Sequence, residues 1–168
     1  MKLIKQIGVC LVLISLLSAC KKDDNNDDTT NLALLLALSG GSTCTVTAGG
    51  VTLPIATVTP TRNTSGSPIT FTTSTGIGLG TVQVIGAVAQ DIGTLTATSG
   101  NYSVAVYKGG CPVNAASNLA VLNTDYSIQS GSLTTVAGSA SIKFLVSGNY
   151  TLLLTTANNA QGSFGFAP

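Results

Sequence analysis

The sequence predicts an all-β domain, an antiparallel β-sandwich, over residues 42–168. Two observations lead to this prediction. Threonine, serine, glycine, valine and alanine dominate the segment, and glutamate is absent from the whole chain, whereas a helical domain needs charged side chains on its solvent-facing surface. Short runs of strand-forming residues also alternate with clusters rich in glycine, asparagine, serine and proline. The segment has the size of one ordinary domain.

The predicted strands follow one another at spacings typical of such a domain. A proline at position 54 inside the first run indicates an edge strand or a bulge. Residues 63–68 and 109–110 are predicted turns. Residues 76–80, Gly-Ile-Gly-Leu-Gly, predict a hairpin or bulge rather than a phosphate-binding loop, because a strand follows them and the lysine of such a loop is missing. The predicted strands are residues 51–58, 69–73, 81–88, 102–108, 139–146 and 150–156.

One eight-residue pattern occurs twice, at residues 99–106 and 147–154, each beginning Ser-Gly-Asn-Tyr. Because alternate strand residues share a face, Tyr102 and Tyr150 should each begin a row of buried side chains. The turn followed by tyrosine resembles the tyrosine corner of immunoglobulin-like sandwiches. It is also similar to the closing strand of sandwich domains that accompany secreted bacterial proteases. These resemblances imply an immunoglobulin-like or jelly-roll-like sandwich and carry no activity.

The amino-terminal 20 residues have the layout of an export signal. Lys2 and Lys5 precede an apolar stretch over residues 7–17, which is too short to span a bilayer as a mature helix. The sequence Leu-Ser-Ala-Cys at positions 17–20 resembles the processing site of bacterial lipoproteins. The resemblance implies a signal peptide over residues 1–19 and an acylated cysteine, Cys20. The alternative is an ordinary cleaved signal with a chance cysteine.

Residues 20–31 are predicted to form the acylated cysteine and a disordered tether, because residues 21–31 contain no strongly apolar side chain. The two lysines followed by acidic pairs also resemble signals that send some lipoproteins to the outer face of the outer membrane. Residues 32–41 predict a short apolar helix or linker, since Asn31 can cap a helix and Gly40 can end one. This segment would pack on its own domain, lie in the membrane interface or contact another subunit.

Cysteine usage predicts one disulfide. Cys10 leaves with the signal and Cys20 carries lipid, so Cys44 and Cys111 remain as two thiols in an oxidising compartment. A bridge between them would close a long loop and contribute about 4 kcal/mol in the chain-entropy model. The alternative is a pair of free thiols.

The composition removes most catalytic chemistry from consideration. The chain has no histidine, which excludes Ser-His-Asp and Cys-His sites and imidazole metal ligands. In residues 42–168 the carboxylates are Asp91 and Asp125 only, so an acid–base pair would have to use both. No metal site and no cofactor are predicted apart from the covalent lipid. A basic patch is missing as well, so nucleic acid is not an expected partner.

We therefore expect a lipid-anchored protein of the bacterial cell envelope, in the outer membrane and exposed at the surface. Its predicted function is that of a non-catalytic binding or adhesion module whose partner is a protein or a glycan. The expected contact loops are residues 62–68 and 108–118. Two alternatives remain: a structural envelope or coat component, and a hydrolase that uses Asp91 and Asp125.

Overall fold

The structure is a computed structural model that describes residues 42–74, 76–157 and 159–168. The predictions for residues 1–41, which are the signal peptide, the acylated Cys20, the tether and the short helix, lie outside these described residues.

The described part of the chain is all-β, as predicted. Within those ranges it contains twelve strands and no helix. The strands are β1 (Thr43–Ala48), β2 (Val51–Val58), β3 (Thr64–Ile69), β4 (Thr72–Ser74), β5 (Ile77–Ala87), β6 (Ile92–Ser99), β7 (Ser103–Lys108), β8 (Val113–Asn114), β9 (Tyr126–Ser130), β10 (Ser139–Phe144), β11 (Gly148–Thr156) and β12 (Gln161–Ala167).

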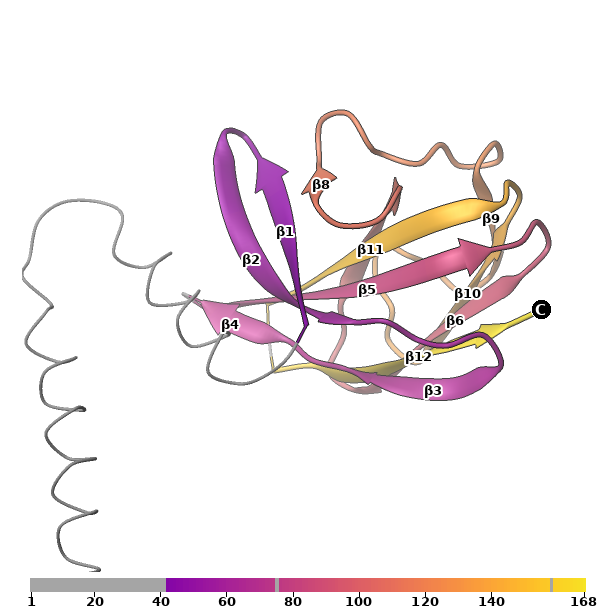
Figure 1. The fold of residues 1–168 in the computed structure, drawn as a ribbon. Helices are drawn as coiled ribbons and strands as arrows, with labels where there is room; N and C mark the ends of the chain where they lie inside the picture. The colour runs from indigo at the N-terminus through magenta and orange to yellow at the C-terminus, as the bar shows by residue number, and fades with distance from the viewer. Residues whose placement is uncertain (1–41, 75, 158) are drawn as a thin grey trace, which may run out of the picture. The chain divides into compact units, whose positions relative to one another are not determined.

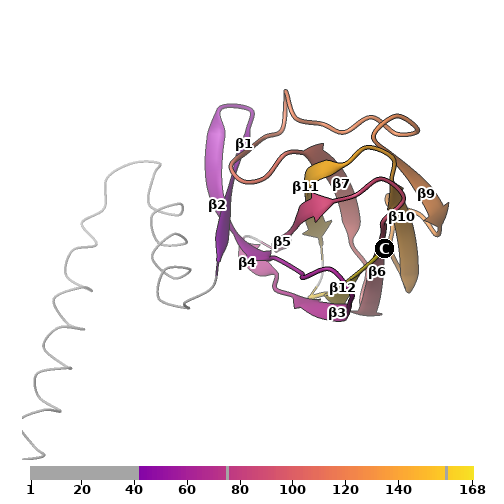
Figure 2. The same ribbon diagram turned by 45° about the vertical axis from the view of Figure 1, so that its right-hand side comes forward.

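These strands form two sheets (Figures 1 and 2). The first sheet has the order β7-β11-β5-β2-β1-β8, and β4 pairs with β5 beside this path. The second sheet has the order β3-β12-β6-β10-β9. Pairing is antiparallel except for β2 with β5 and β1 with β8, which run parallel.

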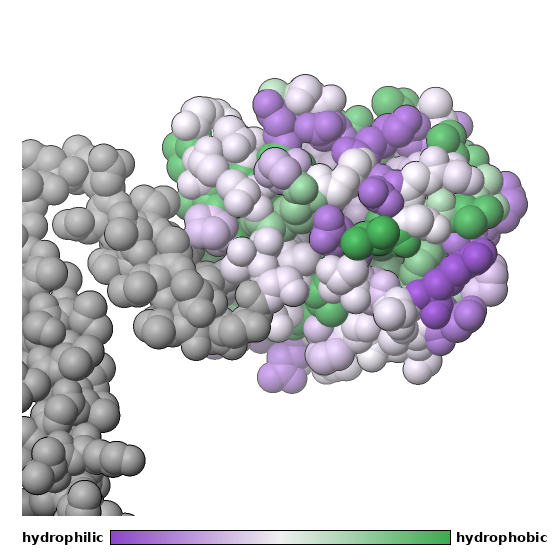
Figure 3. All heavy atoms as spheres, in the orientation of Figure 1, coloured by the Kyte–Doolittle hydropathy of each residue, from purple (hydrophilic) through white to green (hydrophobic). Residues whose placement is uncertain are grey.

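The main hydrophobic core draws on both sheets. Val82 of β5 and Leu152 of β11 come from the first sheet, and Leu95 of β6 and Phe164 of β12 come from the second; all four are completely buried in one cluster. A smaller cluster joins β1, β2, β7 and β8 around Cys44, and it also includes Val46, Ile55, Tyr107 and Val113. The face drawn in Figure 3 is largely pale, of intermediate hydropathy, with hydrophilic and hydrophobic residues scattered over it.

The predicted strands at 51–58, 81–88, 102–108, 139–146 and 150–156 correspond to β2, β5, β7, β10 and β11. Two neighbouring predictions were wrong. Residues 63–68 were predicted as a turn but supply most of β3, and the predicted strand at 69–73 is interrupted between Ile69 and Thr72. β3 pairs only with β12 in the second sheet, so serine, glycine and Pro68 are tolerated on this edge.

Pro54 occupies the kind of position that the sequence predicts. β2 has neighbours on both sides in the strand order, but it pairs with β5 only at Thr57 and Val58. At Pro54 it pairs with Thr45 of β1 alone, without a register shift. The strand is therefore locally an edge where the proline lacks its N–H.

The repeated pattern also places its side chains as predicted. Tyr102 and Val106 are buried in the main core. Tyr150, Leu152 and Leu154 are buried there as well, and each is at most 1 % exposed.

Candidate functional site

The two copies of the repeated pattern lie on adjacent antiparallel strands and so begin at opposite ends. Tyr150 at the start of β11 pairs with Lys108 at the end of β7, while Ser103 at the start of β7 pairs with Thr155. We call the end around residues 86–91, 121–125 and 144–150 the aspartate end. The end around residues 69–78 and 156–162, with Tyr102, is called the cleft end.

Asp91 closes a turn at the aspartate end. Its carboxylate is buried, forms an ion pair with the Arg62 guanidinium, and accepts a hydrogen bond of 2.9 Å from the Val88 N–H. Its main-chain carbonyl accepts the N–H of Phe144 at 2.9 Å. Arg62 therefore forms an ion pair while its side chain stays 43 % exposed.

Asp125 closes a second turn in the same way. The Lys108 ammonium lies 2.9 Å from one carboxylate oxygen, and the Val121 N–H donates to the other at 2.8 Å. The hydrogen bond from Lys108, together with that from Val121, lowers the pKa of Asp125. The hydrogen bond to Asp125, in turn, raises the pKa of Lys108. The Tyr150 hydroxyl donates to the carbonyls of Val146 at 2.7 Å and of Asp125 at 3.1 Å.

These contacts bear on the predicted acid–base pair. Asp91 and Asp125 each belong to a separate ion pair, and each accepts the N–H of the residue that opens its own turn. Both carboxylates are therefore used in holding the turns that lead into β6 and β9.

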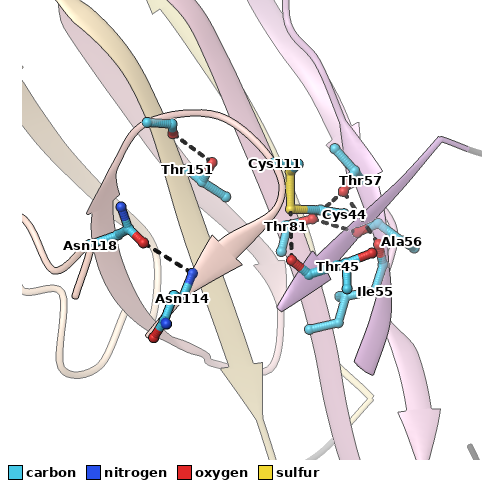
Figure 4. Close-up of a disulfide and its surroundings, with 11 residues drawn as sticks. Cys44, Thr45, Ile55, Ala56, Thr57, Thr81, Cys111, Asn114, Asn118 and Thr151 are labelled. Atoms are coloured by element: carbon cyan, nitrogen blue, oxygen red, sulfur yellow. Dashed lines mark hydrogen bonds between the residues drawn. A yellow bond between two sulfur atoms is a disulfide. The ribbon is translucent and has the colours of Figure 1, made fainter. Parts of the chain in front are cut away.

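The predicted disulfide is present between Cys44 and Cys111, whose Cα atoms lie 5.3 Å apart (Figure 4). Cys44 lies in β1 and is fully buried, and Cys111 lies in the loop after β7. The Lys108 N–H donates to the Asn118 carbonyl at 2.7 Å and closes this loop. The sequence-predicted contact segment 108–118 is thus held to β1 by a covalent bond, whereas segment 62–68 is largely strand β3.

A cleft of about 250 Å³ lies at the cleft end. Its lining comes from the end of β3, the β4–β5 hairpin, the end of β11 and the start of β12; β4 and the start of β5 lie at the left-hand end of the domain in Figure 1. The lining residues are Ile69, Phe71, Thr73, Gly78, Thr156, Asn159, Ala160 and Gln161.

None of these eight lining side chains carries a charge. Thr73, Asn159 and Gln161 are exposed, Phe71 is half-buried, and Thr156 donates to the Asn101 carbonyl at 2.8 Å. Sequence reasoning did not single out this cleft. Residues such as Asn159 and Gln161 form no recognisable motif, and only folding brings them beside residues 69–78.

Tyr102 lies behind the cleft. Its ring centroid is 5.6 Å from that of Phe71, and its side chain is 1 % exposed. Its hydroxyl has no hydrogen-bond partner among the described residues. Burial without such a partner raises the pKa of Tyr102 to about 12.

Within the described ranges, no three His, Cys, Asp or Glu side chains come together as a group that could hold a metal ion. No helix in those ranges is long and apolar enough to cross a membrane. Comparison of the chain with known protein families, with curated proteins and with solved structures finds no match.

Proposed function

We propose that this chain is a lipid-anchored protein of the bacterial envelope that acts as a non-catalytic binding module on the cell surface. The anchor proposal is supported by Leu-Ser-Ala-Cys at positions 17–20 and by the polar, charge-rich residues 21–31 that follow. The proposed architecture is an immunoglobulin-like or jelly-roll-like sandwich, which the two sheets and their common core support.

One observation carries the non-catalytic part of the proposal. Asp91 and Asp125 are the only carboxylates in the described side chains, and both are held in ion pairs that close turns. A general acid or base has to reach a substrate proton, and these carboxylates already accept main-chain N–H groups. Uncharged hydrogen-bonding side chains line the cleft at the other end, which suits binding without chemistry.

The anchor is tested by growing the native bacterium with a radiolabelled fatty acid and isolating the protein. We expect label in the wild-type chain and no label in Cys20→Ala. Cys10→Ala is the matched control, because that residue lies in the proposed signal peptide, and it should retain the label. An equally labelled Cys20→Ala chain would overturn the anchor. Protease treatment of intact cells then tests surface exposure, since removal of the domain supports it and full protection contradicts it.

A structural role in an envelope layer is the second candidate, and exposed apolar side chains at the aspartate end favour it. Val88, Val121 and Val146 are 46 %, 56 % and 40 % exposed. Main-chain hydrogen bonds join the turns that carry Val88 and Val121 to the end of β10 and the residues after it. The Asp91 carbonyl accepts the Phe144 N–H at 2.9 Å, and the Asp125 carbonyl accepts the Val146 N–H at 3.4 Å. Cross-linking in intact cells distinguishes the candidates, because a coat component should give ladders of this chain without added ligand.

A further inference from the structure

We propose that the cleft at the cleft end binds a neutral saccharide ring. This inference rests on the proposed binding function and gives it a site and a ligand class. The charged side chains of the described domain lie at the aspartate end. Arg62, Lys108, Asp91 and Asp125 are paired at the aspartate end, and Lys143 in β10 pairs with Ile92 next to Asp91.

The cleft lies far from these charges. Thr156 lines it, and Tyr150 lies six residues earlier in the same strand, which corresponds to about 20 Å along β11. That separation exceeds the Debye length of about 8 Å at physiological ionic strength, so the charged end adds little electrostatic attraction at the cleft. An ionic ligand would lose part of its hydration there and gain no ion pair with any of the eight lining residues, which favours an uncharged ligand.

The exposed polar side chains match a ligand with many hydroxyl groups. Asn159 and Gln161 each offer an amide that both donates and accepts, and Thr73 adds a hydroxyl. Sugar hydroxyls also donate and accept, so amide side chains can pair with them in both directions. Phe71 adds an aromatic surface supported from behind by Tyr102, and such a ring packs against the C–H face of a sugar.

The backbone around the cleft argues against an extended peptide as the ligand. Gly78 already pairs with Thr73 of β4 on one side and with Thr156 of β11 on the other. Gly162, next to Gln161, pairs with both Ile69 and Ala97. A peptide that adds a strand needs an unpaired edge, and Gly78 and Gly162 offer none. Among the described strands, β3 and β4 each pair with one strand only, so strand addition would have to use their outer edges.

Gly78 keeps part of this cavity free of side chain. A Cβ atom at this position would lie 2.7 Å from Cγ2 of Thr156 and 3.7 Å from Cβ of Phe71, both of which belong to lining residues. The volume of about 250 Å³ is slightly below the usual range for drug-sized ligands, which fits one or two sugar rings.

The proposal is tested by calorimetry on the full mature chain in detergent micelles. The probes are maltotriose and tri-N-acetylchitotriose as neutral saccharides and trigalacturonate as an acidic one. We expect at least one neutral probe to bind with a millimolar Kd or tighter, and the acidic probe to bind more weakly. Asn159→Ala and Gln161→Ala should each weaken binding by about five- to tenfold, because each removes an amide that pairs with hydroxyls.

Gln129→Ala is the matched control, since Gln129 is an exposed glutamine on β9 that does not line the cleft. It should leave the affinity unchanged. The proposal is overturned if neither neutral probe binds at millimolar concentrations, if trigalacturonate binds more tightly than both, or if Gln129→Ala and Gln161→Ala bind equally well. Circular dichroism of each variant shows whether the fold is retained.

A second measurement separates the proposal of saccharide binding in the cleft from the broader proposal of a binding module. Adhesion of intact cells to host tissue or to neighbouring bacteria is compared among wild type, a deletion strain and a strain with Gln161→Ala. If deletion abolishes adhesion while no saccharide binds the chain, the cleft proposal fails and the binding module stands. If the deletion strain adheres like wild type and no saccharide binds, both proposals fail.

Discussion

Tyr102 and Tyr150 occupy the same place in two copies of one sequence pattern, yet their hydroxyl groups have opposite environments. Both side chains are 1 % exposed and both rings belong to the main core. The Tyr150 hydroxyl donates to two main-chain carbonyls, whereas the Tyr102 hydroxyl has no partner in the described part of the chain. The local pattern therefore sets which face of the strand is buried but does not set the hydrogen bonding of the ring.

The surroundings of the two hydroxyl groups differ. Before Tyr150, the chain folds back so that the Val146 carbonyl, four residues upstream, lies within reach of the ring hydroxyl. Before Tyr102, Gly100 has a left-handed φ of 64°, and no carbonyl of the described residues accepts the Tyr102 hydroxyl. Only Tyr150 forms the hydrogen bond that defines a tyrosine corner.

The largest expected effect concerns the loop that the Cys44–Cys111 disulfide closes. Replacing Cys44 and Cys111 together by alanine should reduce the free energy of unfolding by about 4 kcal/mol, because the disulfide closes a loop with a sequence separation of 67 residues. Denaturant titration of the purified chain measures this loss. Hydrogen exchange should accelerate in β1 and in residues 111–118, with β6 and β12 as internal controls. Unchanged stability would show that the bond contributes little.

Gly162→Ala probes the tight packing around Tyr102. A Cβ at position 162 would lie 2.7 Å from the Thr96 carbonyl oxygen and 2.9 Å from Cε1 of Tyr102. We expect a loss of about 2–3 kcal/mol, since two neighbouring strands would have to move. Gly66→Ala on β3 is the matched control, because a Cβ there meets only the Ser163 side chain at 3.4 Å or more. Equal stability of the two variants would contradict the packing described for the cleft end.

Acid should weaken the aspartate end through Asp125. Its folded-state pKa lies below the ordinary value of 3.8, so the unfolded chain binds the proton more readily and stability falls as the pH drops through that region. Asp125→Asn should lose about 2 kcal/mol at pH 7. Its difference from wild type should shrink as the pH falls below the ordinary value of 3.8 and through the lower folded-state pKa. Asp27→Asn, in the predicted tether, is the control. A difference between Asp125→Asn and wild type that stays constant with pH would refute the role given to Asp125.

Alkali should weaken the cleft end through Tyr102. Its pKa rises from 10.0 to about 12 on folding, so between pH 10 and 12 the unfolded chain releases the proton while the folded chain retains it. Stability is therefore lost as the pH rises through this window. Tyr102→Phe should flatten this part of the stability curve relative to wild type. A curve of unchanged slope would contradict the buried, unpartnered hydroxyl.

The sequence predicted the parts of the fold that local composition determines. The predicted strand over residues 51–58 has the same bounds as β2 (Val51–Val58), because this segment combines strand-forming residues with flanking turns. The sequence did not predict β12, because Gln-Gly-Ser-Phe-Gly-Phe-Ala carries two glycines. The glycines become favourable only where β12 lies between β3 and β6 in the sheet. Close contacts that exclude a side chain at Gly162 are a property of the assembled sheets and leave no local signal.

The candidate site shows the same division. The Cys44–Cys111 disulfide was predicted by counting thiols, without knowledge of the topology, and the structure confirms it. The ion pairs of Asp91 and Asp125 could not be predicted, because Arg62 lies 29 residues from Asp91 and Lys108 precedes Asp125 by a whole loop. The cleft joins two chain segments, 69–78 and 156–161, that carry no motif, so only the structure brings its residues together.

The most direct test compares Tyr102→Phe with Tyr150→Phe by denaturant unfolding at pH 7. Tyr150→Phe should lose about 1–2 kcal/mol because it removes a hydroxyl that donates to buried carbonyls, whereas Tyr102→Phe should leave stability unchanged or raise it by up to about 1 kcal/mol. Equal losses in the two variants, or a larger loss for Tyr102→Phe, would contradict the account of two differently built ends.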